Sequence, residues 1–209
     1  MPEFAKVIDK PDASDYKKKK KIYFVRNLYL PKNATSGYKT IYDRYWSEVD
    51  KHLTKLEVAG KITKIFCESL YISGKDAMKV IGSMNEKLEK IVQNKIDAGA
   101  ELLPLESKEI FSVYMDWYNC LIHVRTREVV DAIKKFLDDE IRKRFEHIKS
   151  VLRENIRDGE AGLLIMREED REHLHLPDDI EAFIVSPPAY DDLLTFVSDR
   201  ESGKEFWRT

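Results

Sequence analysis

The chain has 209 residues, of which 43% are hydrophobic and 35% are charged, and its 36 basic and 38 acidic residues leave a formal net charge of -2. This length suits one generous domain or two small ones, and the hydrophobic fraction is sufficient for a buried core. A nearly neutral chain offers no overall field to nucleic acid or to an anionic membrane, so the composition argues against both partners.

The sequence also indicates where the protein acts. Its longest apolar runs fall short of the roughly 18 residues of a membrane span, and its first residues lack the apolar segment of a signal peptide. Cys67 and Cys120 lie in apolar patterns with no disulfide-like spacing around them. We therefore expect buried free thiols, a reducing environment and a cytoplasmic protein.

The first third of the chain predicts a strand, a helix and a second strand. Residues 1–20 are polar and lead into the lysine run Lys17–Lys21. We expect a loosely ordered arm and interpret the lysines as a solvated edge. A β-rich run over 22–30 stops at Pro31, apolar residues at helical spacing follow over 38–59, and 62–71 is again β-rich.

The remainder predicts mainly helices and then two strands. Ser73 is placed to cap a single helix that reaches residue 97, and 102–105 is interpreted as a connector. The later expected elements are helices over 107–123 and 126–156, strands over 162–166 and 180–185 separated by a 167–179 loop, and a helix opened by Pro188.

Short apolar strands joined by helices predict an α/β fold. We expect a layered, mostly parallel sheet of about four strands flanked by helices, with a long helix or helical hairpin in the second half. Residues 21–200 would form a single domain, and 201–209 a polar tail that contains Phe206–Trp207.

A pocket hypothesis follows from this fold. Arg26 and Asn27 are polar residues inside the first strand. Burying such residues is costly, so either the strand is an outer strand of the sheet or its C-terminal half emerges into a cleft. Open α/β sheets bind ligands at the carboxyl ends of their strands. The residues expected at that edge are Arg26, Asn27, Ser69, Tyr71, Ser73 and Arg167.

The 167–179 loop holds the densest set of metal-ligand types in the chain. His173 and His175 stand two residues apart, and Asp170 is the carboxylate that would complete a metal site with them. The alternative is a solvated acidic loop. Dinucleotide-binding, P-loop, zinc-protease and serine-hydrolase motifs do not occur, so the sequence leaves any cofactor unidentified.

The C-terminal third carries one resemblance. The run Gly159–Glu160–Ala161–Gly162–Leu163–Leu164–Ile165–Met166, followed by Leu176–Pro177–Asp178–Asp179–Ile180–Glu181, resembles the ending of a set of uncharacterised prokaryotic α/β proteins. The resemblance covers about 40 residues and implies a stand-alone cytoplasmic protein. It implies no reaction.

These observations favour an oligomeric module that binds a small, charged ligand or a protein. We expect a homo-oligomer that uses the apolar stripe over Phe136–Ile156 or the Phe206–Trp207 tail. One alternative is a hydrolase that acts on a small charged substrate, with or without a metal. A second is an RNA- or ribosome-associated factor that uses Lys17–Lys21 and basic helix residues such as Arg142, Lys143 and Arg144. Whether the protein is an enzyme stays open at this point.

Overall fold

The structure, a computed structural model, describes residues 19–205, with side chains to residue 198. Five strands form one sheet in the order β3-β2-β4-β1-β5, and every neighbouring pair is parallel. The strands are β1 (Lys20–Arg26), β2 (Ile62–Cys67), β3 (Glu101–Leu103), β4 (Ala161–Met166) and β5 (Ile180–Val185). The helices are α2 (Ser36–Leu56), α3 (Gly74–Met84), α4 (Glu86–Asp97), α5 (Lys108–His123), α6 (Arg127–Asn155), α7 (Glu168–His173) and α8 (Pro188–Glu205). The predicted α/β fold is confirmed.

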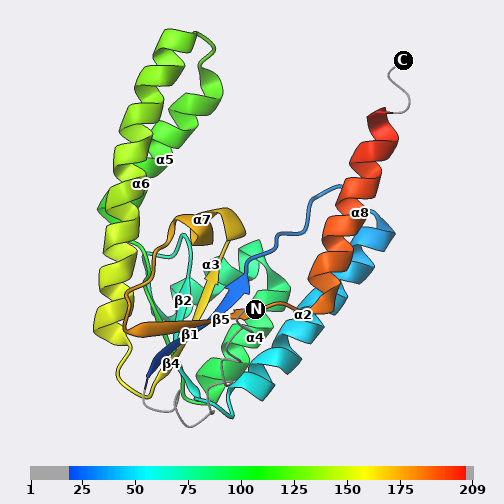
Figure 1. The fold of residues 1–209 in the computed structure, drawn as a ribbon, viewed down its shortest axis with the longest axis vertical. Coiled ribbons are helices and arrows are strands. Elements are labelled where there is room, and N and C mark those ends of the chain that lie inside the picture. Colours follow the sequence, from blue (N-terminus) through cyan, green and yellow to red (C-terminus); the bar gives the residue numbers. More distant parts are fainter. Residues whose placement is uncertain (1–18, 206–209) are drawn as a thin grey trace, which may run out of the picture.

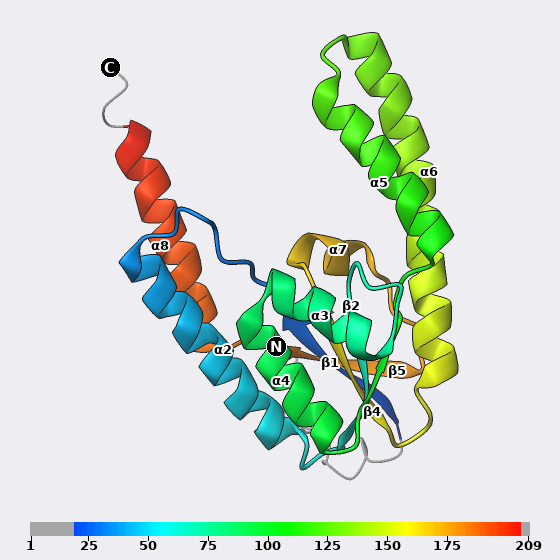
Figure 2. The same ribbon diagram turned by 180° about the vertical axis from the view of Figure 1, so that it is seen from behind.

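Helices cover both faces of the sheet, as a parallel sheet requires. Because side chains alternate along a strand, Tyr23 and Val25 of β1 face a core shared with α2, α3, α4 and α8, while Ile22 and Phe24 face a core shared with α6. In Figures 1 and 2, α6 runs along one side of the sheet and the α2–α8 pair along the other.

The central strand, β4, is buried along its whole length. Its Gly162 permits a close approach from the α6 side, because a Cβ atom there would stand only 2.9 Å from Cδ1 of Ile156 and 3.2 Å from Cε2 of Phe66. Gly162 therefore has a packing role inside the strand.

The predicted helical hairpin is formed by α5 and α6. The C-terminal half of α6 lies on the sheet through Phe145, Ile148 and Leu152. The N-terminal half packs against α5, where the rings of Trp117 and Phe136 are stacked with centroids 4.8 Å apart. The far end of the hairpin projects beyond the sheet (Figures 1 and 2).

Several predicted boundaries were wrong. β1 ends at Arg26 and β2 at Cys67, not at residues 30 and 71, because only the first residue after each strand still bonds to β4. The single helix over 73–97 is divided, because Asn85 leaves the helical backbone and its side-chain oxygen caps α4 by accepting hydrogen bonds from the N–H groups of Lys87 and Leu88, both at 3.1 Å. The connector over 102–105 overlaps β3, whose three residues are too few for a periodic pattern. The 167–179 loop contains the short helix α7.

The burial of one predicted thiol and of part of the predicted self-association stripe also differs from expectation. Cys67 is buried as expected, but Cys120 is exposed, because α5 projects with α6 and lacks a second layer over it. Ile148, Leu152 and Ile156 are buried in the monomer, so only the Phe136 end of the predicted self-association stripe is exposed. Phe206–Trp207 and residues 1–18 lie outside the described part of the chain.

Two features bear on partners. Within residues 19–205 no helix combines the length and the apolar character needed to cross a membrane. In the lysine run, Lys20 is paired with Asp179 at 2.9 Å and Lys21 is fully buried, so neither adds to an exposed basic patch.

Candidate functional site

The carboxyl ends of β1, β4 and β2 bring together residues from three distant parts of the sequence. The ladder continues one residue past each strand, since the N–H of Asn27 donates to the carbonyl of Met166 and the N–H of Glu68 donates to the carbonyl of Ile165. β1 lies between β4 and β5, so Arg26 and Asn27 do not belong to an edge strand. They lie instead at the carboxyl ends of the strands, where ligands bind in open parallel sheets.

Glu68 is fully buried at this edge and accepts four hydrogen bonds. Asn27 Nδ2 and the hydroxyl of Tyr29 donate to Oε1 at 3.0 and 3.1 Å, and the backbone N–H and Nε of Arg167 donate to Oε2 at 2.9 and 3.3 Å. Burial raises the pKa of Glu68, although the donors from Arg167 and Asn27 act in the opposite direction. The four donors therefore fix the position of the carboxylate, while burial disfavours its charged form.

Arg144 extends the same network from α6. Its Nε and Nη2 donate to the Glu106 carboxylate at distances of 2.6–3.0 Å, and its Nη1 donates to Asp170 at 2.9 Å. Burial alone would lower the pKa of Arg144, but the hydrogen bonds and charge of Glu106, with those of Asp170, outweigh it and raise the pKa. Arg167 joins the group around Glu68 to the group around Arg144, because its Nη2 also donates to Asp170 at 3.1 Å.

A cleft of about 360 Å³ opens in front of this network, between the carboxyl edge of the sheet and α5. The residues that line it are Tyr29, Ser69, Phe111, Tyr114, Met115, Tyr118 and Arg167. The side chain of Arg167 is 42% exposed, whereas those of Glu68 and Arg144 are shielded from solvent. The charge that a ligand meets in the cleft is therefore positive.

Ser69 adds a strained backbone to the cleft. Its φ of 64° is the only positive value at a residue other than glycine among the described residues. Its N–H donates to Glu106 Oε1 at 3.2 Å, and the N–H groups of Leu105 and Glu106 both donate to the carbonyl of Leu70. Such strain persists only where surrounding contacts enforce it, and it is concentrated at functional sites.

The structure divides the remaining residues of the pocket hypothesis. Asn27 lies behind the cleft, and Ser69 and Arg167 line it. Tyr71 adjoins it, with its ring 6.2 Å from that of Phe111. Arg26 belongs to a different cluster, where its Nε pairs with Glu168 at 2.7 Å and its guanidinium lies over the ring of Tyr190.

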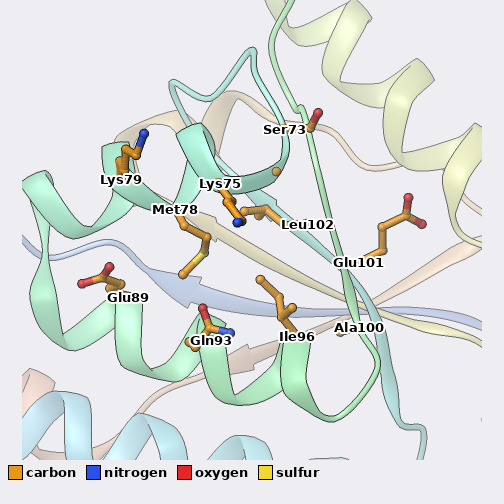
Figure 3. Close-up of a pocket in the computed structure, with 11 residues that line it drawn as sticks. Ser73, Lys75, Met78, Lys79, Glu89, Gln93, Ile96, Ala100, Glu101 and Leu102 are labelled. Carbon is orange, nitrogen blue, oxygen red and sulfur yellow. The ribbon is translucent and has the colours of Figure 1, made fainter.

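Ser73 lies in a larger cavity, of about 810 Å³, between α3, α4 and the edge strand β3. Figure 3 shows Met78, Ile96 and Leu102 around this hollow, with Lys75 and Glu89 among the polar side chains. Among the described residues, no charged side chain in its lining is held by a buried carboxylate, as Arg167 is in the smaller cleft. Because a specific polar site needs fixed polar groups, we place the candidate site in the smaller cleft.

The metal prediction gains no support. Among residues 19–205, no group of three or more His, Cys, Asp and Glu side chains is arranged to hold a metal ion. Asp170 is bonded to Arg144 and Arg167, while His173 ends α7 with its ring 6.2 Å from that of Phe145.

Sequence reasoning did not select Tyr29, Glu68 or Glu106, and it considered Arg144 only as a basic surface residue for RNA. Glu68 carried a signal, because it interrupts an apolar run in the same way as Arg26–Asn27. Glu106 and Arg144 carried none, since each looks like an ordinary surface residue until its partner, 38 positions away, is known.

Comparison with known protein families, with curated proteins and with solved structures finds no match to this chain. The resemblance of the C-terminal ending therefore stays an expectation, and the function has to be argued from the cleft.

Glu68 should make the protein less stable as the pH rises. Its folded-state pKa lies above the ordinary value of 4.5, so the folded state binds more protons than the unfolded state between those two values. Stability contributed by the neutral acid is complete below about pH 4.5 and is lost as the pH rises through the folded pKa. We expect the unfolding free energy of wild type, minus that of Glu68→Gln, to fall as the pH rises above about 4.5.

Urea denaturation of both proteins at each pH would measure this difference. A pH-independent difference, or one that grows with pH, would show that the four donors keep Glu68 ionised in the folded protein.

Proposed function

We propose that the protein is a small-ligand-binding module that holds an anionic ligand in the cleft at the carboxyl edge of its sheet. The observation that carries this proposal is the guanidinium of Arg167, which is half-exposed in the cleft and held from behind by Glu68 and Asp170. A positioned cation at the ligand-binding edge of a parallel sheet is suited to a carboxylate or phosphate.

The hydrogen bonds of Arg167 leave part of the guanidinium available. Nε is directed to Glu68 and Nη2 to Asp170, and no other described residue accepts a hydrogen bond from this group. A guanidinium has more N–H donors than these two bonds use, and its planar fork matches the two oxygens of a carboxylate or phosphate. The ligand would accept hydrogen bonds from the N–H groups of Arg167 that Glu68 and Asp170 leave available.

The charge balance of the network makes anion binding depend on the protonation of Glu68. The network contains three carboxylates, those of Glu68, Glu106 and Asp170, against the guanidiniums of Arg144 and Arg167. Protonation of Glu68, whose pKa burial already raises, would leave equal numbers of each charge. Anion binding should therefore be accompanied by proton uptake at Glu68 and be stronger at lower pH.

Arg167→Gln tests the proposal. Loss of a charged hydrogen-bonding pair costs about 1.5–3 kcal/mol, so we expect affinity for the bound anion to fall about tenfold or more. The measurement is native mass spectrometry of the freshly purified proteins, followed by thermal-shift titration with a panel of carboxylates and phosphates.

Arg142→Gln provides the matched control, because Arg142 is an exposed arginine on α6 that pairs with Asp139 outside the cleft. The control should bind as wild type does. A wild-type protein that binds no member of the panel, or equal binding by Arg167→Gln, would contradict the proposal.

A second candidate is a hydrolase for a small charged substrate. The strained Ser69 favours it, because a serine at the end of a strand with φ of 64° resembles the sharp turn that presents a nucleophile. No histidine lines the cleft, so the base that would activate Ser69 is not identified. Covalent labelling of Ser69 by a fluorophosphonate probe would bring this candidate forward.

The cytoplasmic localisation and the homo-oligomer also belong to this proposal. The buried free thiol of Cys67 supports a reducing environment. Exposed apolar side chains on the projecting hairpin, among them Ile122 at 61% and Phe136 at 52%, support a contact with a second copy or another protein.

A further inference from the structure

The wall of the cleft is an unbroken row of aromatic rings. Tyr71, Phe111, Tyr114 and Tyr118 follow one another with centroid separations of 6.2, 6.0 and 6.2 Å. The last three lie on α5 at spacings of three and four residues, so they share one side of that helix. The interplanar angle is 33° between Phe111 and Tyr114, which are tilted, and 30° between Tyr114 and Tyr118, which are stacked.

The row is anchored from within by Arg144. Its guanidinium carbon lies 5.1 Å from the ring centroid of Tyr114 and 5.6 Å from that of Phe111. Because Arg144 is itself fixed by Glu106 and Asp170, the inner part of the row is held in place before any ligand arrives. A rigid wall loses little entropy when a ligand binds to it.

The outer rings remain accessible. Tyr71 is 40% exposed and Tyr118 is 43% exposed, although tyrosines in a packed helical wall are usually better covered. The hydroxyls of Tyr71, Tyr114 and Tyr118 form no hydrogen bond with any described side chain or backbone group. The wall therefore offers ring faces and polar hydroxyls together, beside the guanidinium of Arg167.

We propose that the ligand is a planar aromatic compound with a carboxylate or phosphate group, whose ring stacks on the exposed ring of Tyr118 at the outer end of this row while its anionic group pairs with Arg167. This inference rests on the proposed function, because both use the same cleft. Arg167 alone would accept any small anion. The aromatic row would favour ligands that carry a ring. The cleft volume of about 360 Å³ suits a small aromatic acid or phosphate.

Two pairs of probes separate the ring from the anion. Adenosine 5′-monophosphate is compared with inorganic phosphate, and 2-naphthoate with acetate, by isothermal titration of the full chain. Stacking on an aromatic side chain contributes about 1–3 kcal/mol, so at least one ring-bearing probe should bind about tenfold more tightly than its ring-free partner. The pair that shows this difference identifies phosphate or carboxylate as the anionic group.

Variants assign the effect to the wall. Tyr118→Leu should reduce the affinity of the ring-bearing probe by about tenfold and leave the ring-free probe unchanged, while Tyr118→Phe keeps the ring and should bind as wild type does. Both substitutions are at a half-exposed residue, so folding is preserved. Arg167→Gln should weaken the ring-bearing and ring-free anions alike.

The outcomes distinguish the two proposals. If phosphate or acetate binds through Arg167 and the ring-bearing probes bind no more tightly, the ring inference is overturned and the proposed function stands. If a ring-bearing probe binds tightly but Tyr118→Leu does not weaken it, the wall assignment is overturned. If no anion binds to wild type, the proposed function fails, and the inference fails with it.

Discussion

Replacing Arg144 by methionine is expected to lower the free energy of unfolding by about 3–5 kcal/mol, because it leaves buried carboxylates without their partner. Glu106 is almost fully buried and receives its charged hydrogen bonds from Arg144, and Asp170 loses one of its two arginines. In a domain of this size the melting temperature should fall by about 6–20 °C. Thermal and urea denaturation would measure both quantities.

The interpretation depends on two further variants. Arg142→Met removes an exposed arginine from the same helix and should change stability by no more than about 0.5 kcal/mol. The double variant Arg144→Met with Glu106→Leu should be more stable than Arg144→Met alone, because the uncompensated carboxylate has gone. A loss with Arg144→Met as small as that of the control would mean that water reaches Glu106 and that the network is not closed.

Leu152→Ala is expected to cost about 2–5 kcal/mol, the usual range for a leucine removed from a packed core. Leu152 is fully buried where the C-terminal half of α6 lies on the sheet. This contact places α6, and therefore α5, beside the carboxyl ends of the strands (Figure 1). The aromatic wall of α5 lines the cleft there. Urea denaturation should show a lower midpoint with an unchanged slope.

Ile122→Ala is the matched control for that prediction. Ile122 is also an aliphatic residue of the hairpin, but it is 61% exposed near the far end, so its replacement should be nearly neutral. Equal losses from the two variants would indicate that the hairpin tip is buried in solution, as it would be in an oligomer, and repetition at several protein concentrations would show this.

Much of the fold could be predicted because local hydrophobic patterns indicate most of its helices and strands. The apolar spacing over 126–156 and the apolar run over 162–166 predicted α6 and β4, and strands joined by helices predicted a parallel sheet with polar residues at its carboxyl edge. The split at Asn85 was missed because an asparagine cap inside a continuous helical stripe changes only one position. The strand β3 was missed because its pairing with β2, and not its three residues, makes it a strand.

The candidate site could be predicted in part. Asn27, Ser69 and Arg167 were expected at the carboxyl edge, and the structure brings them to one place, whereas Arg26 and Ser73 lie elsewhere. Strand ends are predictable from the sequence, but the direction in which each side chain leaves the strand depends on the neighbouring elements. The order β2-β4-β1 puts Glu68 beside Arg167, 99 positions later in the chain.

The sequence by itself determined most of the long helices and strands, the parallel layered class and the edge of the sheet where a site would lie, because hydrophobic periodicity depends only on near neighbours in the chain. Only the tertiary structure decided that Arg144, Glu106, Asp170, Arg167 and Glu68 form one buried network and that the rings of α5 face it. A buried charge is stable only with a partner, and that partner is set by strand order and helix placement.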